Sequence, residues 1–328
     1  MRPLIVFLVF LLTGLTACSQ VPEGGSPQVT PSAPAQTASP TLPPASSSPA
    51  PAAPTSTLLP AATPPISDTL TPNTATPTLS PDAWMVMPVI PTFSDTAREI
   101  YKRGLSMGRD PRRFSKAGDC ESTTGWYLAE FDREPPTYRL GDYSNLQSTI
   151  EYYAGSFGRE SLAVRRGANT SSLLTSLWAD QKQCEAGESM LACEYRFHNP
   201  SVVIIAVGTN DSLGVDNFEE QMRHIIEFTI SEGIVPVLGT KADNAEGDHA
   251  INAIVAKLAY EYDIPLWNFW LAVQTLPNHG LDSDGAHLTF AGNRFDNPAN
   301  MQKAWPWRNL TALQTLDAAR QALESVAP

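Results

Sequence analysis

Basic side chains are scarce in this 328-residue chain, which has 22 lysines and arginines against 34 aspartates and glutamates and a formal net charge of -12. A surface with this excess of negative charge repels phosphate backbones and anionic lipid headgroups. The composition therefore argues against nucleic acid as a partner. Histidine and cysteine are also few, with five and four residues, and their spacing does not resemble a zinc site. No metal is expected.

The apolar run at the N-terminus is too short to cross a membrane as a helix. It covers residues 4–12, follows the positive charge of Arg2 and leads into small residues, which is typical of a secretory signal peptide. The letters LTAC that end at Cys18 resemble the bacterial lipobox. Residues 1–18 are therefore predicted to be a lipoprotein signal peptide with lipidation at Cys18. An ordinary signal peptide with an incidental cysteine is the alternative.

Residues 19–81 consist mainly of proline, alanine, serine and threonine, with acids only at Glu23 and Asp68. Such a segment cannot bury enough apolar area to offset its ordering entropy, so we expect a disordered stalk. Residues 82–328 carry a formal charge of -11, because the preceding 81 residues hold one base and two acids. This length suits one α/β domain. We expect an extracytoplasmic domain that is tethered to the cell membrane by the lipid on Cys18.

Short apolar, β-branched runs alternate with amphipathic stretches along the domain. This alternation predicts a parallel sheet that helices cover on both faces. The predicted strands are 114–118, 162–165, 202–207, 234–238 and 264–267. The predicted helices are 95–107, 143–153, 170–179, 217–231, 249–262 and 310–326.

Polar clusters follow these strands, where a parallel sheet places its functional site. Any one cluster alone is a weak signal, because turns that end strands are commonly polar. Four clusters at one edge of a sheet indicate a composite site. They are Gly118-Asp119-Cys120, Arg166-Gly167-Ala168-Asn169, Gly208-Thr209-Asn210-Asp211 and, beyond the last strand, Asp284-Gly285-Ala286-His287.

Asp284 and His287 are three residues apart in a glycine-containing turn. This spacing lets the carboxylate accept from the imidazole Nδ1–H and leaves Nε2 as a base. A loop aspartate that caps its own turn beside a surface histidine is the alternative. Asn210 and the backbone at Gly167, together with the Cys120 amide, offer three donors for a developing oxyanion.

In four separate blocks these residues resemble the SGNH (GDSL-type) hydrolases. The blocks are Gly118-Asp119-Cys120, Gly167, Gly208-Thr209-Asn210-Asp211 and Asp284-Gly285-Ala286-His287-Leu288-Thr289, in the order of the family, and they span about residues 112–292. The resemblance implies a three-layer α/β/α sandwich with a five-stranded parallel sheet of the flavodoxin-like type. It also implies a Ser-His-Asp ester hydrolase without metal or cofactor. The flanking stretches LWNFW and NPANMQKAWPWRNLTALQTLDA resemble extracytoplasmic bacterial lipoproteins of this group.

Cys120 stands where the family has its nucleophilic serine. A thiolate is a better nucleophile than a hydroxyl, and an adjacent histidine can lower the pKa of a cysteine. Ser122 matches no family position and ranks well below Cys120 as a nucleophile. The assigned residues are Cys120, His287 and Asp284 as the catalytic triad, Cys120, Gly167 and Asn210 as the oxyanion hole, and Asp119 and Gly208 in support.

The four cysteines are expected to have three different fates. Cys184 and Cys193 enclose a short polar loop that a disulfide closes easily, so we predict that they are bonded to each other. With Cys18 lipidated, this pairing leaves Cys120 as a thiol. A disulfide from Cys120 to either member of the pair is the alternative and would make the site structural.

Two functions fit these residues. The first is a membrane-anchored ester hydrolase for small acyl esters, with carbohydrate esters suggested by analogy. The second is an inactive protein of the same fold that binds a glycan or cell-wall polymer, which the replacement of the serine favours. We prefer the enzyme, because a lost site has no reason to keep the histidine, the aspartate and the oxyanion groups together.

Overall fold

A computed structural model describes residues 79–325 of the chain. This range covers the predicted domain up to its last three residues, whereas the signal peptide and all of the stalk before residue 79 lie outside it. Within these residues, no helix combines the length and the apolar character that a membrane crossing requires.

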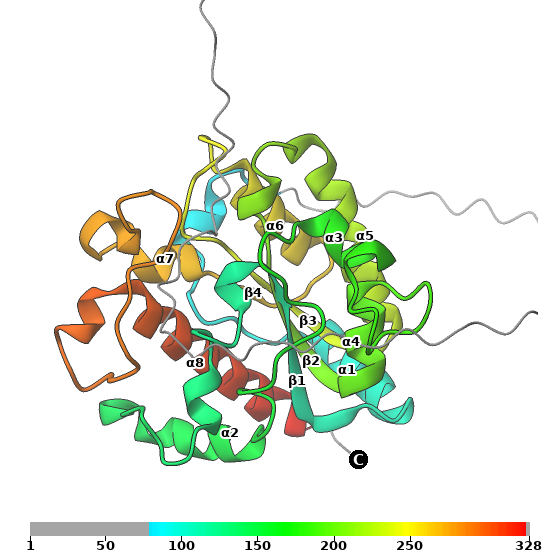
Figure 1. Ribbon diagram of the computed structural model, residues 1–328, viewed down its shortest axis with the longest axis horizontal. Helices are drawn as coiled ribbons and strands as arrows, with labels where there is room; N and C mark the ends of the chain where they lie inside the picture. Colours follow the sequence, from blue (N-terminus) through cyan, green and yellow to red (C-terminus); the bar gives the residue numbers. More distant parts are fainter. Residues whose placement is uncertain (1–78, 326–328) are drawn as a thin grey trace, which may run out of the picture. The chain divides into compact units, whose positions relative to one another are not determined.

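The core of the domain is a parallel sheet of four strands in the order β1-β2-β3-β4 (Figure 1). All seven residues of β2 are buried, as expected for an inner strand that helices cover. At the carboxyl end of the sheet Gly118 pairs with Ala206, and Gly239 pairs with Trp267. The strands are β1 (Asp110–Gly118), β2 (Pro200–Ala206), β3 (Val235–Gly239) and β4 (Leu266–Trp267).

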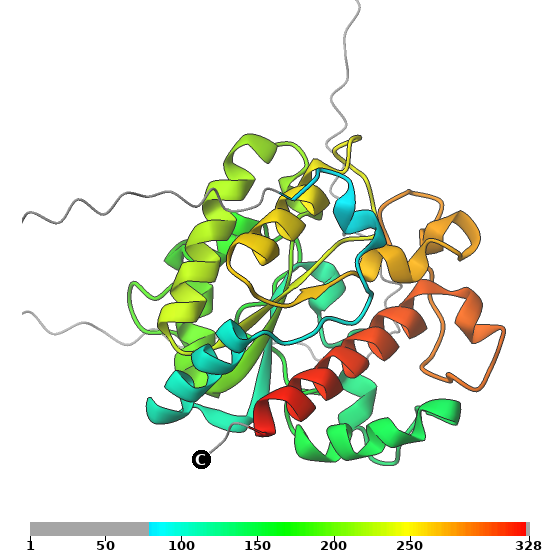
Figure 2. The ribbon, with the colours of Figure 1, turned by 180° about the vertical axis from the view of Figure 1, so that it is seen from behind.

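Helices flank the sheet in two groups, which lie to either side of it in both views (Figures 1 and 2). One group is α2 (Gln147–Tyr152), α7 (Phe269–Val273) and α8 (Ala304–Glu324), in which α8 contacts the other two. The other is α3 (Thr170–Leu174), α4 (Met190–His198), α5 (Phe218–Ser231) and α6 (Ala250–Glu261). A further helix, α1 (Asp95–Ser106), packs against β2, β3 and α8. An α/β fold with a helix-flanked parallel sheet was the expected class.

The prediction of a fifth strand at 162–165 is wrong for the described part of the chain. Val164 makes a single parallel bridge to Gly118, and the residues around it form turns. Ser161 explains the early turn, because its hydroxyl accepts from the Ala163 amide and donates to the Lys116 carbonyl. This side chain takes the place of ladder hydrogen bonds beside β1.

Several helices differ from the prediction. Helix α2 begins at Gln147 rather than at residue 143, α3 ends at Leu174 rather than at residue 179, and α7 was not predicted. Helix α4 was not predicted, although Ser189 caps it by accepting from the Ala192 amide. Helix α8 begins six residues before the predicted start, at Ala304 rather than Leu310. Pro306 lies in the first turn of α8, where a proline removes no intrahelical hydrogen bond.

Candidate active site

The first polar cluster forms the turn that follows β1. Strand β1 ends at Gly118, and a 3₁₀ turn, η2, covers Cys120–Ser122. Asp119 caps this turn by accepting from the Glu121 amide at 3.1 Å. Cys120 is half-buried at the carboxyl end of the sheet, where the sequence predicts the reacting group. Ser122 is 1% exposed and its hydroxyl faces the Ala206 carbonyl, so it is not available to a substrate.

Cys120 is disulfide-bonded, so the expectation that it remains a thiol is wrong for the oxidised protein that the structure describes. Neither member of the predicted pair is its partner, because Cys184 and Cys193 are bonded to each other. A disulfide sulfur does not attack esters, so nucleophilic chemistry at Cys120 requires the reduced form.

The second cluster is held against the first and the third by hydrogen bonds. The Arg165 amide donates to the Gly118 carbonyl at 3.2 Å. Asn210 Nδ2 donates to the Ala168 carbonyl at 2.9 Å. Between these anchors Gly167 has φ +77°, a left-handed conformation that glycine adopts without strain. Its amide donates no hydrogen bond within residues 79–325 and is available to a substrate oxygen.

The third cluster is fixed on both sides of Asn210. Gly208 has φ +143°, and a Cβ there would lie 2.7 Å from a side-chain carbon of Ile251. Asp211 accepts from the Thr170 amide at 3.1 Å and from its hydroxyl at 2.5 Å. Burial raises the pKa of Asp211, although both hydrogen bonds lower it. Since one Nδ2 proton of Asn210 binds the 167–168 segment, the other remains for an oxyanion.

Thr209 is anchored by a buried lysine that follows β3. Lys241 Nζ donates to Asp243 Oδ1 and to Glu246 Oε2, both at 2.6 Å. Asp243 Oδ2 in turn accepts from the Thr209 hydroxyl at 2.7 Å. The Lys241 and Asp243 side chains are 6% and 1% exposed. This chain of contacts holds Thr209, which is next to Asn210 in the chain.

Asp284 and His287 form the hydrogen bond that their spacing predicts. His287 Nδ1 lies 2.5 Å from Asp284 Oδ2, and Asp284 Oδ1 accepts from the Ala286 and His287 amides at 3.0 and 2.9 Å. Partial burial raises the pKa of Asp284, but the bonds from the His287 ring and the two amides outweigh it and lower the pKa to about 2. The ionised carboxylate therefore holds the proton on Nδ1 and leaves Nε2 as the basic nitrogen.

An aromatic contact joins the segment that follows His287 to the segment that follows Cys120. The rings of Phe290 and Trp126 pack edge to face with centroids 4.5 Å apart. They are three and six residues beyond His287 and Cys120, and are 56% and 38% exposed. The His287 turn is closed by a bridge between Leu281 and Leu288. The fourth cluster thus lies at the same end of the molecule as the first.

Arg308 of α8 holds the turn that carries Cys120. The Arg308 side chain is 2% exposed, and its Nε donates to the Glu121 carbonyl at 3.1 Å. Its guanidinium lies 3.6 Å from the Glu121 carboxylate and 4.9 to 5.2 Å from the ring centres of Tyr127, Trp267 and Phe269. Cation–π contacts of this kind are strongest away from water. Arg308 therefore fixes η2 from the core side.

Two buried carboxyls beside this turn have raised pKa values. Burial raises the pKa of Glu121 to about 8 and outweighs the guanidinium of Arg308, which lowers it. Burial also raises the pKa of Asp119 to about 6, against the hydrogen bond from the Glu121 amide. Asp119 is thus a protonatable cap of the Cys120 turn rather than a permanently ionised one.

Sequence reasoning missed Arg308, Lys241 and Asp243. A signal for the two bases was present, because each lies within three residues of an apolar stretch that the fold buries. A base in such a stretch usually has an acidic partner. The identity of that partner depends on tertiary contacts between segments far apart in the chain, which the local pattern does not contain.

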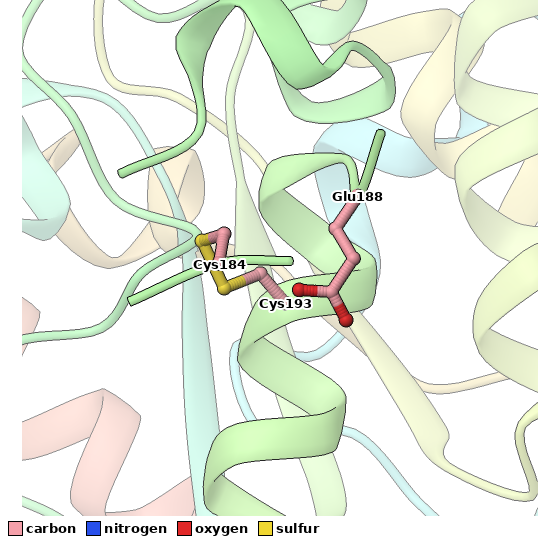
Figure 3. A group of neighbouring side chains, drawn as sticks. All are labelled: Cys184, Glu188 and Cys193. Carbon is pink, nitrogen blue, oxygen red and sulfur yellow. A yellow bond between two sulfur atoms is a disulfide. The ribbon is translucent and has the colours of Figure 1, made fainter. Parts of the chain in front are cut away.

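The predicted disulfide is confirmed. Cys184 and Cys193 are bonded, with their Cα atoms 5.2 Å apart, and the Glu188 side chain lies beside the bond (Figure 3). The three side chains do not form a metal site, because both sulfurs are used in the covalent bond. The Glu188 carboxylate accepts from Arg196 Nε and from the Glu185 amide.

Comparisons with known proteins give structural similarity at low identity. The chain is similar to a GDSL-like lipase from Bacteroides thetaiotaomicron, with 15% identity, a TM-score of 0.38 and coverage of 70% of this chain and 98% of that one. It is also similar to Axe2, an acetylxylan esterase from Geobacillus stearothermophilus, with 13% identity, a TM-score of 0.38 and coverage of 62% and 93%. These identities and TM-scores are too low for an activity to be carried over. No family model and no curated protein matches the chain.

Proposed function

We propose that the protein is a carboxylic ester hydrolase whose nucleophile is the thiolate that reduction of Cys120 releases. The observation that carries the proposal is the 2.5 Å bond between His287 and an ionised Asp284. The ring contact between Phe290 and Trp126, and the hydrogen bonds that join the Gly118, Gly167 and Asn210 segments, support it. An oriented base and preorganised donors beside a sulfur are what acyl transfer requires.

In the proposed reaction His287 Nε2 takes the proton of the reduced Cys120 thiol, and the resulting thiolate attacks the acyl carbon. A C–S bond forms and the carbonyl electron pair moves onto oxygen, where the Cys120 and Gly167 amides and Asn210 Nδ2 stabilise it. Collapse breaks the C–O bond, and His287 Nε2–H gives its proton to the leaving alcohol. Water then attacks the thioester while Nε2 takes its proton, which releases the carboxylic acid and the thiolate.

Asp284 keeps one proton on Nδ1 through both steps, because its pKa of about 2 leaves it ionised at neutral pH. The substrate class that we propose is a small acyl ester, with carbohydrate as an alcohol component that suits a domain on the cell surface. This part rests on the predicted anchor at Cys18. Partition of the full-length protein into detergent, lost in Cys18→Ala, tests the anchor.

Hydrolysis of para-nitrophenyl acetate by the full-length protein tests the activity. We expect turnover in the presence of a thiol reductant, loss of most of the rate without it, and a fall of about 10³-fold or more in His287→Gln. His224→Gln is the matched control, because His224 is 60% exposed on α5. Equal rates in the two histidine variants, or none above buffer in the wild type, would move the glycan-binding alternative to first place.

A further inference from the structure

Arg166 is exposed and lies in the second polar cluster, directly before Gly167. Hydrogen bonds hold the backbone on both sides of this residue. The Arg165 amide donates to the Gly118 carbonyl, and Asn210 Nδ2 donates to the Ala168 carbonyl. The position of Arg166 is therefore set by the same contacts that set the proposed oxyanion donors. The charge of Arg166 is therefore one residue away from the amide of Gly167, a proposed oxyanion donor.

The Arg166 guanidinium is not used inside the domain. Among the arginines of residues 79–325, it and Arg294 make no side-chain hydrogen bond, ion pair or ring contact. The neighbouring Arg165, by contrast, donates to the Trp178 carbonyl at 2.9 Å and lies 5.4 Å from its ring centre. In a domain with an excess of acids, an arginine that has no acidic partner gives the site a local positive charge.

We propose that Arg166 selects esters that carry an anionic oxygen group, a carboxylate or a phosphate, close to the scissile bond. The inference rests on the proposed ester hydrolysis and names its substrate class. Arginine suits the task because its planar donors match both groups and remain charged at every physiological pH.

The test compares three acetate esters on the reduced full-length protein. They are phenyl acetate, para-acetoxybenzoate and para-acetoxyphenyl phosphate, which differ only in the charged group on the alcohol side. We expect Arg166→Gln to lower the ratio of kcat/KM for a charged ester to that for phenyl acetate about fivefold. The effect should shrink at high ionic strength. The ester with the larger loss identifies a carboxylate or a phosphate as the recognised group.

Arg294→Gln is the matched control, since it removes the same charge from another exposed arginine without a partner. An unchanged ratio in Arg166→Gln, or an equal fall in Arg294→Gln, would overturn the proposal. Wild-type protein that does not hydrolyse phenyl acetate would contradict the ester hydrolase. In that case the role of Arg166 is tested by NMR titration, which compares the binding of para-acetamidobenzoate, an anion, with that of the uncharged acetanilide. Tighter binding of the anion in the wild type than in Arg166→Gln supports the proposal, and equal binding overturns it.

Discussion

The contact between Asp284 and His287 is the part of the site that the residues themselves determine most directly. The two side chains belong to one turn, so their 2.5 Å contact depends on three intervening peptide bonds and not on the rest of the fold. The two amides that bind Asp284 Oδ1 come from the same turn. Local geometry therefore both orients the histidine and lowers the pKa of its partner to about 2.

Asp284→Asn is expected to lower kcat for para-nitrophenyl acetate by about 10³-fold with little change in KM. An amide accepts less strongly than a carboxylate and allows the tautomer with the proton on Nε2. Asp282→Asn is the control, because Asp282 lies two residues away, is exposed and binds only the Ser283 amide with its side chain. Similar rates for both variants would show that Asp284 caps its turn without orienting the base.

At the scale of elements, the turn after β1 carries both Cys120 and the buried carboxyl group of Glu121. The raised pKa of Glu121, about 8, means that the folded protein binds this proton more tightly than the unfolded chain, where the value is 4.5. Between these values the folded state holds more protons. The free energy of unfolding therefore falls as the pH rises from about 5 to 8.

Glu121→Gln is expected to remove this contribution. The wild type should lose on the order of 3 kcal/mol of unfolding free energy between pH 5 and 8 relative to the variant, as measured by urea unfolding. Glu99→Gln serves as the control, because the Glu99 side chain on α1 is 70% exposed. Parallel pH profiles for wild type and Glu121→Gln would mean that Glu121 is ionised throughout, held by Arg308.

The loop before α4 offers a second test at this scale. Removing the Cys184–Cys193 disulfide in the double serine variant should lower the unfolding free energy by about 2 to 3 kcal/mol, because the bond restricts a short loop in the unfolded chain. The loop makes no contact with Asp284 or His287 among the interactions of residues 79–325. Ester hydrolysis should therefore be retained below the unfolding transition. A parallel loss of activity would connect α4 to the site.

Features that depend on local sequence could be predicted, whereas features that depend on contacts between distant residues could not. The strands around 202–207 and 234–238 follow from long β-branched runs, and the disulfide follows from the short loop that it closes. The fifth strand was wrong because a serine side chain at 161 replaces ladder bonds next to β1. The hydrogen bond from Arg308 to the Glu121 carbonyl was not predictable, since the two residues are 187 positions apart in the chain.

At the scale of the whole molecule, the catalytic proposal depends on the oxidation state of one sulfur. The sheet brings the Gly118, Gly167 and Asn210 segments into contact, whereas the disulfide at Cys120 removes the nucleophile. Under the proposed function, the reduced protein hydrolyses esters and the disulfide-bonded protein does not.

Trapping of the acyl-enzyme tests this account most directly. The reduced full-length protein is mixed with para-nitrophenyl acetate, quenched with acid within the first turnovers and analysed by peptide mass spectrometry. The account predicts one acetyl group on the peptide that contains Cys120, and neither adduct nor turnover in Cys120→Ala. Undiminished hydrolysis by Cys120→Ala, or an acetyl group found only on another residue, would contradict it.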